Sequence, residues 1–360
     1  MISNRLGWIG VDIGTHTIKL AQAERTPSGV RVRHAAVIQR AHPWSAEDSL
    51  ALGDPLSSRD EIHAALECDA FRGRDAACLL PMNVCDLRGL NVPHGDEHER
   101  RAMIENELGD EWTNGPVPME FDFWELGADG RPETADGFNV NVLCVSRPWV
   151  TQAAGDCQQS SLDCWAVDGG PLAMARAVGH VANTTSGQRV LAVDWGYSSA
   201  TLCVVGHNRP LYARRIHECG LRRCLESVAG TIGVSLDHAQ HLAQVHGVLP
   251  PGEHARDRNG LQTAVSESFA ETIERLIEQI QRTMRFVDLQ RKHLRPTSVW
   301  LMGGGASVRN IGPHLSAALE LPVSIWSMGR ESELDSAAAG GRAALFAGAF
   351  ALSTLAWRAA

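Results

Sequence analysis

The chain has 360 residues, of which 44% are hydrophobic and 21% charged, proportions typical of a soluble globular protein with room for two domains. Its formal charge of −9 excludes a predominantly basic surface, so no nucleic-acid partner is expected. Nine cysteines without a Cys-x-x-Cys pair, and an N-terminus without a charged and then apolar leader, predict a reduced protein of the cytoplasm.

A hairpin near the start of the chain carries the first functional signal. Residues 9–20 predict a β-strand, an Asp-x-Gly turn and a second strand. Glycine lets backbone N–H groups approach an anion, and a lysine supplies a positive charge for a terminal phosphate. A carboxylate here can orient a hydrated Mg²⁺. The same pattern also occurs in hairpins without a ligand. The candidate residues are Asp12, Gly14, Thr15, Thr17 and Lys19.

The segment that follows, 76–167, differs in character from the opening hairpin. We expect it to be a compact α+β insert that contains little suggestive of catalysis and serves to contact a partner. The pattern predicts strands over 77–81, 86–92, 119–126, 139–146 and 164–167, and helices over 97–108 and 148–159.

Asp168 stands between a predicted strand and an alanine-rich helix over 172–182. It is a candidate helix cap. It is equally a candidate catalytic carboxylate that points into a cleft and orients water or Mg²⁺. The two interpretations are compatible.

Residues 191–202 repeat the opening hairpin, with an apolar strand, Asp-x-Gly, a hydroxyl-rich turn and another strand. Thr201 stands where the first copy has Lys19, so the two copies are similar but not equivalent. Two such hairpins predict a cleft in which a phosphate chain is held from both sides, with Mg²⁺ bound through water near Asp12 and Asp194. The candidate residues of the second copy are Asp194, Gly196, Ser198 and Ser199.

The remainder of the chain predicts mainly helices. They cover 220–230, 235–246 and 264–294, and a strand over 298–302 then leads into Gly303, Gly304 and Gly305. A glycine run between a strand and a helix lets a flat ring or a sugar-phosphate lie against the backbone. The apolar segment 343–357 is shorter than the ~20 residues of a membrane span, so it is predicted to be a buried closing helix.

The order of these three segments, two phosphate hairpins and then a glycine-rich loop, resembles the actin-like ATPase superfamily, which also includes sugar kinases and the large heat-shock chaperones. Within it the chain is most similar to the PilM family of type IV pilus assembly proteins, which are related to the cell-division protein FtsA. The similarity extends over nearly the whole chain, including Leu79-Leu80-Pro81, Ile104-Glu105-x-Glu107, Ala166-Val167-Asp168, Pro171-Leu172-Ala173 and 274–285.

This resemblance implies an α/β actin-like ATPase fold, with two related half-domains around a nucleotide cleft and a small α+β insert in the first half. The first half would comprise 1–75 and 168–190, closed by a C-terminal helix over 338–360. The insert would be 76–167, and the second half 191–337, with a helical subdomain over 220–296.

The resemblance also implies a function. The protein would be a cytoplasmic scaffold that binds ATP or ADP with Mg²⁺, with Gly303, Gly304 and Gly305 behind the adenosine. Its partner would be the N-terminal cytoplasmic tail of a PilN-like inner-membrane protein, so it would reach the inner face of the membrane only through that partner. Self-association is a further expectation, and ATP hydrolysis would be weak at most.

Two departures from the family affect the nucleotide site. The family usually has an acidic residue and a lysine in the helix near the adenine, whereas this chain has Ala239-Gln240-His241-Leu242-Ala243. Trp195 and Tyr197 are also bulky for the second hairpin, so nucleotide affinity could be weakened. Two alternatives remain open: a small-molecule kinase, such as a sugar kinase, and a filament-forming protein like FtsA or MreB. Use in pili, DNA uptake or secretion also stays open.

Overall fold

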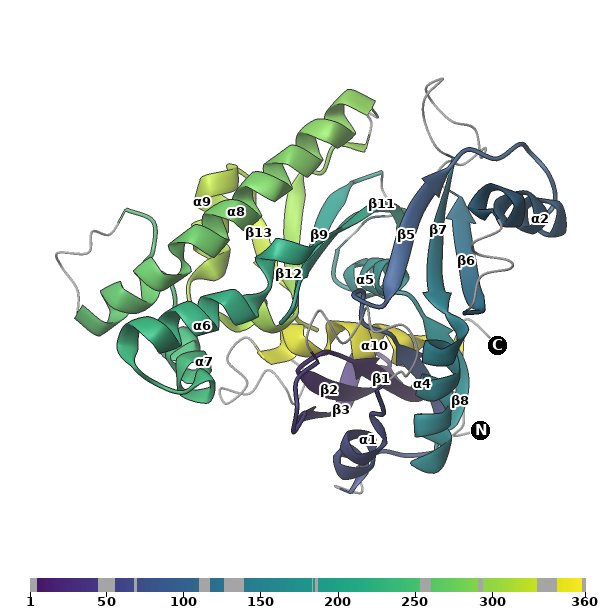
Figure 1. Ribbon diagram of the computed structural model, residues 1–360, viewed down its shortest axis with the longest axis horizontal. Coiled ribbons are helices and arrows are strands. Elements are labelled where there is room, and N and C mark those ends of the chain that lie inside the picture. Colours follow the sequence, from purple (N-terminus) through teal and green to yellow (C-terminus); the bar gives the residue numbers. More distant parts are fainter. Residues whose placement is uncertain are drawn as a thin grey trace.

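The structure is a computed structural model, which describes residues 5–44, 56–67, 70–109, 117–125, 139–182, 184, 187–252, 260–290, 294–328 and 342–357. Two five-stranded sheets form most of it, and each sheet packs against its own helices (Figure 1). The first sheet has the order β3-β2-β1-β4-β8, from β1 (Leu6–Ile13), β2 (Thr17–Thr26), β3 (Gly29–Gln39), β4 (Asp75–Leu79) and β8 (Asp163–Asp168).

The second sheet repeats the first in order and direction. Its order is β11-β10-β9-β12-β13, from β9 (Val190–Trp195), β10 (Ala200–Gly206), β11 (Arg209–Ile216), β12 (Ser298–Met302) and β13 (Val323–Ile325). In each sheet three antiparallel strands are followed by two parallel ones. The predicted repeat of the hairpin therefore extends to the whole sheet, and the α/β fold with two related halves is confirmed.

The two sheets are joined by a pair of short apolar helices, α5 (Gly170–Gly179) and α10 (Ala347–Ser353), which pack against each other. In Figure 1, α10 lies in yellow along β1 and β2. Gly10 on β1 permits this contact, because a Cβ there would meet the carbonyl oxygen of Ala349. The closing helix predicted over 338–360 is shorter in the structure. It is α10 alone, with 3₁₀ turns over 342–346 and 354–357 on either side of it. Residues 338–341 and 358–360 lie outside the described part.

The insert is smaller than the predicted 76–167. Strand pairing places β4 and β8 in the first sheet, and α4 (Arg147–Gln159) packs on that sheet through Ala153 and Cys157. The separate layer runs from β5 (Cys85–Leu90) through α2 (Glu97–Leu108) and β6 (Met119–Glu125) to β7 (Val140–Ser146), with sheet order β5-β7-β6. The prediction was too wide because strands that follow one another in sequence need not pair with one another.

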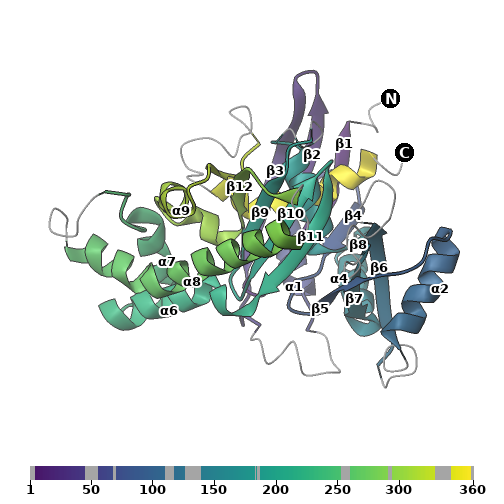
Figure 2. The ribbon, with the colours of Figure 1, turned by 90° about the horizontal axis from the view of Figure 1, so that it is seen from above.

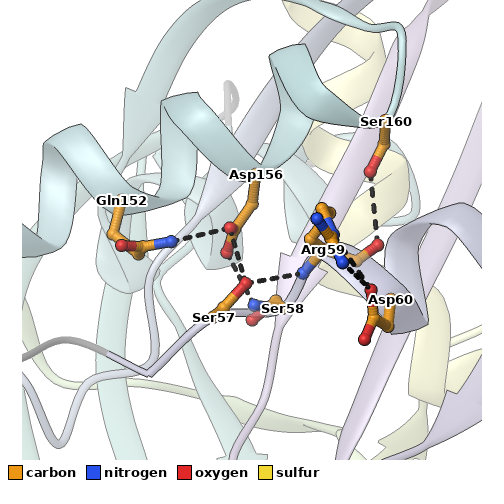
Figure 3. Close-up of polar contacts among 7 residues, drawn as sticks. All are labelled: Ser57, Ser58, Arg59, Asp60, Gln152, Asp156 and Ser160. Atoms are coloured by element: carbon orange, nitrogen blue, oxygen red, sulfur yellow. Dashed lines mark hydrogen bonds and ion pairs between the residues drawn. The ribbon is translucent and has the colours of Figure 1, made fainter.

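The far face of the first sheet is covered by α4 and α1 (Arg59–Leu66). A buried carboxylate, Asp156 on α4, fixes the start of α1 (Figure 3). It accepts hydrogen bonds from Ser57 Oγ at 2.8 Å, Ser58 N at 2.6 Å and Gln152 Nε2 at 2.7 Å. An acidic side chain at a helix N-terminus satisfies otherwise unpaired backbone donors, so α4 holds α1 in place.

The second half carries a helical group at the far end of the molecule from the insert (Figures 1 and 2). It consists of α6 (Leu221–Ile232), α7 (Leu236–Val245) and the long α8 (Gly260–Gln290), and α9 (Ile311–Leu319) follows β12. Val265, Phe269, Leu276 and Ile280 recur at helical spacing along α8, and all four are buried. None of the helices in the described residues is long and apolar enough to cross a membrane.

Candidate nucleotide site

A cavity of about 370 Å³ lies between the two sheets, a size in the usual range for small-molecule and cofactor sites. Both hairpins contribute to its walls, together with the segment after β12, the linker between β4 and β5, and one face of α7. Eleven of the thirteen sequence-predicted site residues line it: Asp12, Gly14, Thr15, Thr17, Lys19, Asp194, Gly196, Ser198, Ser199, Gly303 and Gly304. Asp12 and Asp194 therefore share one cavity although 182 positions separate them in the chain.

The first hairpin places a lysine beside its aspartate. Asp12 and Lys19 are directly opposite in the β1–β2 ladder, and Lys19 Nζ lies 3.2 Å from Asp12 Oδ2. The turn is closed by a hydrogen bond from Gly14 N to Thr17 O. A Cβ on Gly14 would lie 2.6 Å from the backbone oxygen of Thr17 and 2.7 Å from Lys19 Nζ, so the turn leaves no room for a side chain at this position. The hairpin thus presents one cation and one carboxylate to the cavity.

The second hairpin has an aspartate without such a partner. Asp194 pairs with Thr201 across the β9–β10 ladder, at the position equivalent to Lys19. Burial, and then the negative charge of Asp12, raises the pKa of Asp194 to about 6, an effect that the charge of Lys19 partly offsets. Asp12 and Asp194 face one cavity, and the charge of Asp12 helps to raise the pKa of Asp194. A cation bound near both carboxylates would offset this repulsion.

The tips of the two hairpins touch across the cavity. His16 and Tyr197 stack with their ring centroids 4.0 Å apart and 9° between the ring planes, and Thr15 Oγ1 lies 3.3 Å from Ser198 Oγ. Burial lowers the pKa of His16, so the imidazole in this stack is neutral at pH 7. These contacts hold the two halves in a closed arrangement on one side of the cavity.

Trp195 lies outside the set of cavity-lining residues, whereas Tyr197 forms part of the cavity wall. The Trp195 ring is fully buried, and its Nε1 donates to the carbonyl oxygen of Cys219 at 2.8 Å. Tyr197 turns toward His16. The bulky residues of the second hairpin are accommodated by packing behind and beside the turn.

Gly303 and Gly304 line the cavity, whereas Gly305 does not. Gly303 has a φ of +82° and approaches Asp194 so closely that a Cβ would meet its carboxylate. A Cβ on Gly305 would collide with the Trp195 ring, so this glycine serves the packing of β9 against the 3₁₀ turn Gly304–Ser307. Sequence spacing could not separate the three roles, because the neighbour that decides the third is 110 positions away.

Asp168 also lies outside the set of cavity-lining residues. Its carboxylate forms a buried ion pair with Arg176, nearly two helical turns into α5, and accepts a hydrogen bond from Gly169 N at 2.8 Å. The structure therefore gives Asp168 a partner on α5 rather than an orientation toward the hairpins. Gly169, not Asp168, is the N-cap residue of α5, so the capping interpretation is not confirmed, and the catalytic one stays a prediction.

Asn83 is a cavity residue that the sequence analysis missed. Both Asn83 Oδ1 and Asn83 Nδ2 are buried, and neither has a hydrogen-bond partner among the described residues. A buried amide without partners is costly, which marks this side chain as a candidate ligand contact. It lies in the short turn between β4 and β5, so no motif signalled it.

Gln240 and Gln244 were also not predicted. They are one turn apart on α7 and both line the cavity. They offer amide donors and acceptors close to where the family pattern has an acidic residue and a lysine.

The class of the protein follows from this arrangement: two related α/β halves with a shared cavity at their hairpin turns form an actin-like ATPase fold. The chain belongs to the family of type IV pilus assembly proteins PilM, whose sequence model matches residues 10–358.

Solved structures agree on the fold. A structure of a PilM–PilN type IV pilus biogenesis complex is similar with a TM-score of 0.75 and 18% identity, over 98% of this chain and 99% of that one. The ethanolamine utilization protein EutJ from Carboxydothermus hydrogenoformans is similar with a TM-score of 0.54 and 13% identity, over 96% and 88% of the two chains. No curated protein sequence matches this chain.

Proposed function

We propose that this protein is a nucleotide-binding scaffold of a type IV pilus assembly platform, located in the cytoplasm and recruited to the inner membrane by a PilN-like partner. The observation that carries the nucleotide part is the single cavity into which both hairpins, Lys19, two aspartates and a glycine segment converge. Family membership and the similarity to a PilM–PilN complex support the scaffold part.

The residues present fit ATP or ADP with Mg²⁺. Lys19 is placed to contact a phosphate, and Thr15, Thr17, Ser198 and Ser199 bring hydroxyl groups from both sides. Asp12 and Asp194 would hold the waters of Mg²⁺, because a buried aspartate with a raised pKa gains most from a nearby cation. Bound Mg²⁺ would neutralise phosphate charge. Gly303 and Gly304 leave room for the base and ribose, and the two glutamines of α7 offer hydrogen bonds to them.

Turnover is expected to be slow. Among the described residues that line the cavity, the acidic ones are Asp12 and Asp194, which the proposal assigns to Mg²⁺, and Asp168 is paired with Arg176. No further carboxylate is therefore placed there to activate water or a substrate hydroxyl, which also disfavours the kinase alternative. We propose nucleotide binding as the role of the site and weak ATP hydrolysis at most.

The linker between β4 and β5 connects the nucleotide cavity to the insert, which is proposed to bind the partner. Leu79, Leu80, Pro81, Met82 and Asn83 all line the cavity, and β5 of the insert begins at Cys85. Met82 also joins the second half, because its carbonyl oxygen accepts a hydrogen bond from Arg215 on β11.

Trp124 of the insert donates from Nε1 to Pro210 O at 2.8 Å, a second contact with that half. A change in how the halves close would therefore move the insert. We propose a subdomain of residues 85–146, which with the first half binds the cytoplasmic tail of the partner.

The test uses isothermal titration calorimetry on the full chain. ATP and ADP are titrated with and without Mg²⁺, and a synthetic peptide of the partner's N-terminal tail is titrated with and without nucleotide. We expect Mg²⁺-dependent nucleotide binding and peptide binding whose affinity changes with nucleotide. Absence of nucleotide binding would reject the site assignment, and absence of peptide binding in every condition would reject the scaffold role. Sedimentation with ATP tests the filament alternative in the same preparation.

A further inference from the structure

Three cysteines that are far apart or irregularly spaced in sequence meet inside the first half. They are Cys78 on β4, Cys157 on α4 and Cys164 on β8. Cys78 Sγ lies 3.1 Å from Cys157 Sγ and 3.9 Å from Cys164 Sγ, and all three sulfurs lie within 4.8 Å of one another. This thiol cluster is separate from the nucleotide cavity, because none of its members lines that cavity.

The fold explains how the cluster forms. β4 and β8 are neighbouring parallel strands, and α4 lies across them before the chain turns back at residues 160–162 into β8. The turn is fixed by a hydrogen bond from Leu162 N to Cys157 O at 2.9 Å. Two strands and one helix thus direct one thiol each to the same point. The sequence spacing, seven residues between Cys157 and Cys164, does not predict this meeting.

The cluster differs from the other cysteines of the described residues. Cys85, Cys144, Cys203, Cys219 and Cys224 take part in no comparable group, and most of them are simple buried thiols. Cys78 and Cys157 are fully buried, whereas Cys164 is partly exposed. At 3.1 Å the Cys78 and Cys157 thiols form a hydrogen bond, so they interact as polar groups rather than only as apolar filling.

The separations match those around a thiolate-bound zinc ion. Zinc binds thiolate sulfur at about 2.3 Å in tetrahedral geometry, which places two sulfur ligands about 3.8 Å apart. Two separations of the cluster are 3.1 Å and 3.9 Å and the third is within 4.8 Å, so small side-chain rotations would place all three sulfurs at bonding distance from one ion. We propose that Cys78, Cys157 and Cys164 bind one zinc-class thiophilic metal ion.

A metal ion binds cysteine as the thiolate, so each of the three thiols would release its proton as the ion enters. A disulfide would use only two of the three sulfurs and would require them to approach to about 2.05 Å.

The ion would tie α4 to the sheet at the residue next to Asp156, the carboxylate that holds the start of α1 (Figure 3). We therefore expect the metal to act structurally, by joining α1, α4 and the sheet into one rigid unit. This inference does not depend on whether the cavity binds a nucleotide.

The experiment uses the full-length chain, reduced and freed of metal. Zn²⁺ and Cd²⁺ are titrated separately, with native mass spectrometry for stoichiometry and ultraviolet absorbance for the cadmium–thiolate charge transfer. We expect one tightly bound ion per chain. Cys164→Ser should weaken binding at least tenfold, and Cys203→Ala, which removes a buried thiol outside the cluster, should leave it unchanged.

Alkylation mapping on the unmodified chain makes the test independent of how the variants fold. Bound Cd²⁺ should protect Cys164, the partly exposed member of the cluster, from a maleimide and leave the reactivity of the cysteines outside the cluster unaltered. The proposal is overturned if the reduced chain binds no ion, if protection falls on other cysteines, or if the protein yields only a Cys78–Cys157 disulfide.

Discussion

The two hairpins have the same backbone and different electrostatics. In the first, Asp12 lies 3.2 Å from the ammonium group of Lys19, and both side chains keep some exposure to the cavity. In the second, Asp194 is also partly buried but lies opposite the uncharged Thr201, and burial and the charge of Asp12 raise its pKa to about 6. The difference suggests a division of labour in which the first hairpin binds phosphate and the second gains most from a cation. The two hairpins share their geometry, and the ladder position that holds Lys19 in one and Thr201 in the other makes their charges differ.

The largest expected effect comes from neutralising Asp194. Its raised pKa means that the folded protein binds this proton more tightly than the unfolded chain, so stability is lost as pH rises from about 4 to about 6. Asp194→Asn removes that loss. The metal-free variant should be more stable at pH 7.5 by up to about 3 kcal/mol, and by about half as much at pH 5. Urea unfolding at the two pH values measures this difference.

The same variant should lose the Mg²⁺ dependence of nucleotide binding, because the buried charge that attracts the ion is gone. Asp122→Asn on the exposed side of β6 is the control for replacing an aspartate by asparagine outside the cavity. A gain that is equal at both pH values would show that the burial of the Asp194 charge is not its source.

A substitution at Lys19 tests the proposed phosphate-binding role of the first hairpin. Lys19→Met keeps most of the side-chain stem and removes the charge, and a hydrogen bond to a charged group contributes about 1.5–3 kcal/mol. ATP affinity should therefore fall about 10- to 100-fold, measured by calorimetry. Thr201→Val, at the equivalent position of the second hairpin, is the matched control and should change affinity less than threefold. Equal losses in the two variants would mean that the hairpins are not specialised.

How far the sequence predicts the site depends on whether a role is local. Asp12, Lys19 and Asp194 were found because a strand, an Asp-x-Gly turn and a second strand are contiguous, and their repetition indicated two related halves. Gly305 and Asp168 were placed differently by the structure, since their surroundings are set by Trp195 and Arg176. The thiol cluster was missed for the same reason, because its three sulfurs come from elements whose packing no short pattern encodes.

The fold shows the same limit. Most strands were predicted within a few residues, but β13 was not predicted. The extent of the insert was also not predicted, because β4 and β8 pair across the whole of it. Asn83 lies at that boundary and has no motif. Only its buried, unpartnered amide identifies it as a candidate ligand contact.

Asn83 tests whether the linker senses the ligand. Asn83→Ala should reduce ATP affinity about 3- to 10-fold, the effect of one hydrogen bond, without lowering the free energy of unfolding of the ligand-free protein. Asn141→Ala is the control, because Asn141 Nδ2 is also buried without a partner but lies in the insert, away from the cavity. Calorimetry and urea unfolding of both variants give the comparison. A loss of affinity in Asn141→Ala as large as in Asn83→Ala would contradict the assignment.

The smallest effect is expected at the contact that joins the two hairpins. An aromatic stack contributes about 0.5–1.5 kcal/mol, so Tyr197→Ala should destabilise the closed arrangement and speed the release of a fluorescent ATP analogue up to about tenfold. Tyr197→Phe keeps the ring over His16 and should release it at the original rate, whereas His16→Ala should reproduce the effect of Tyr197→Ala. Stopped-flow measurement separates these cases. If Tyr197→Phe releases the analogue as fast as Tyr197→Ala, the hydroxyl and not the stack controls opening, and the two hairpins are joined mainly through Thr15 and Ser198.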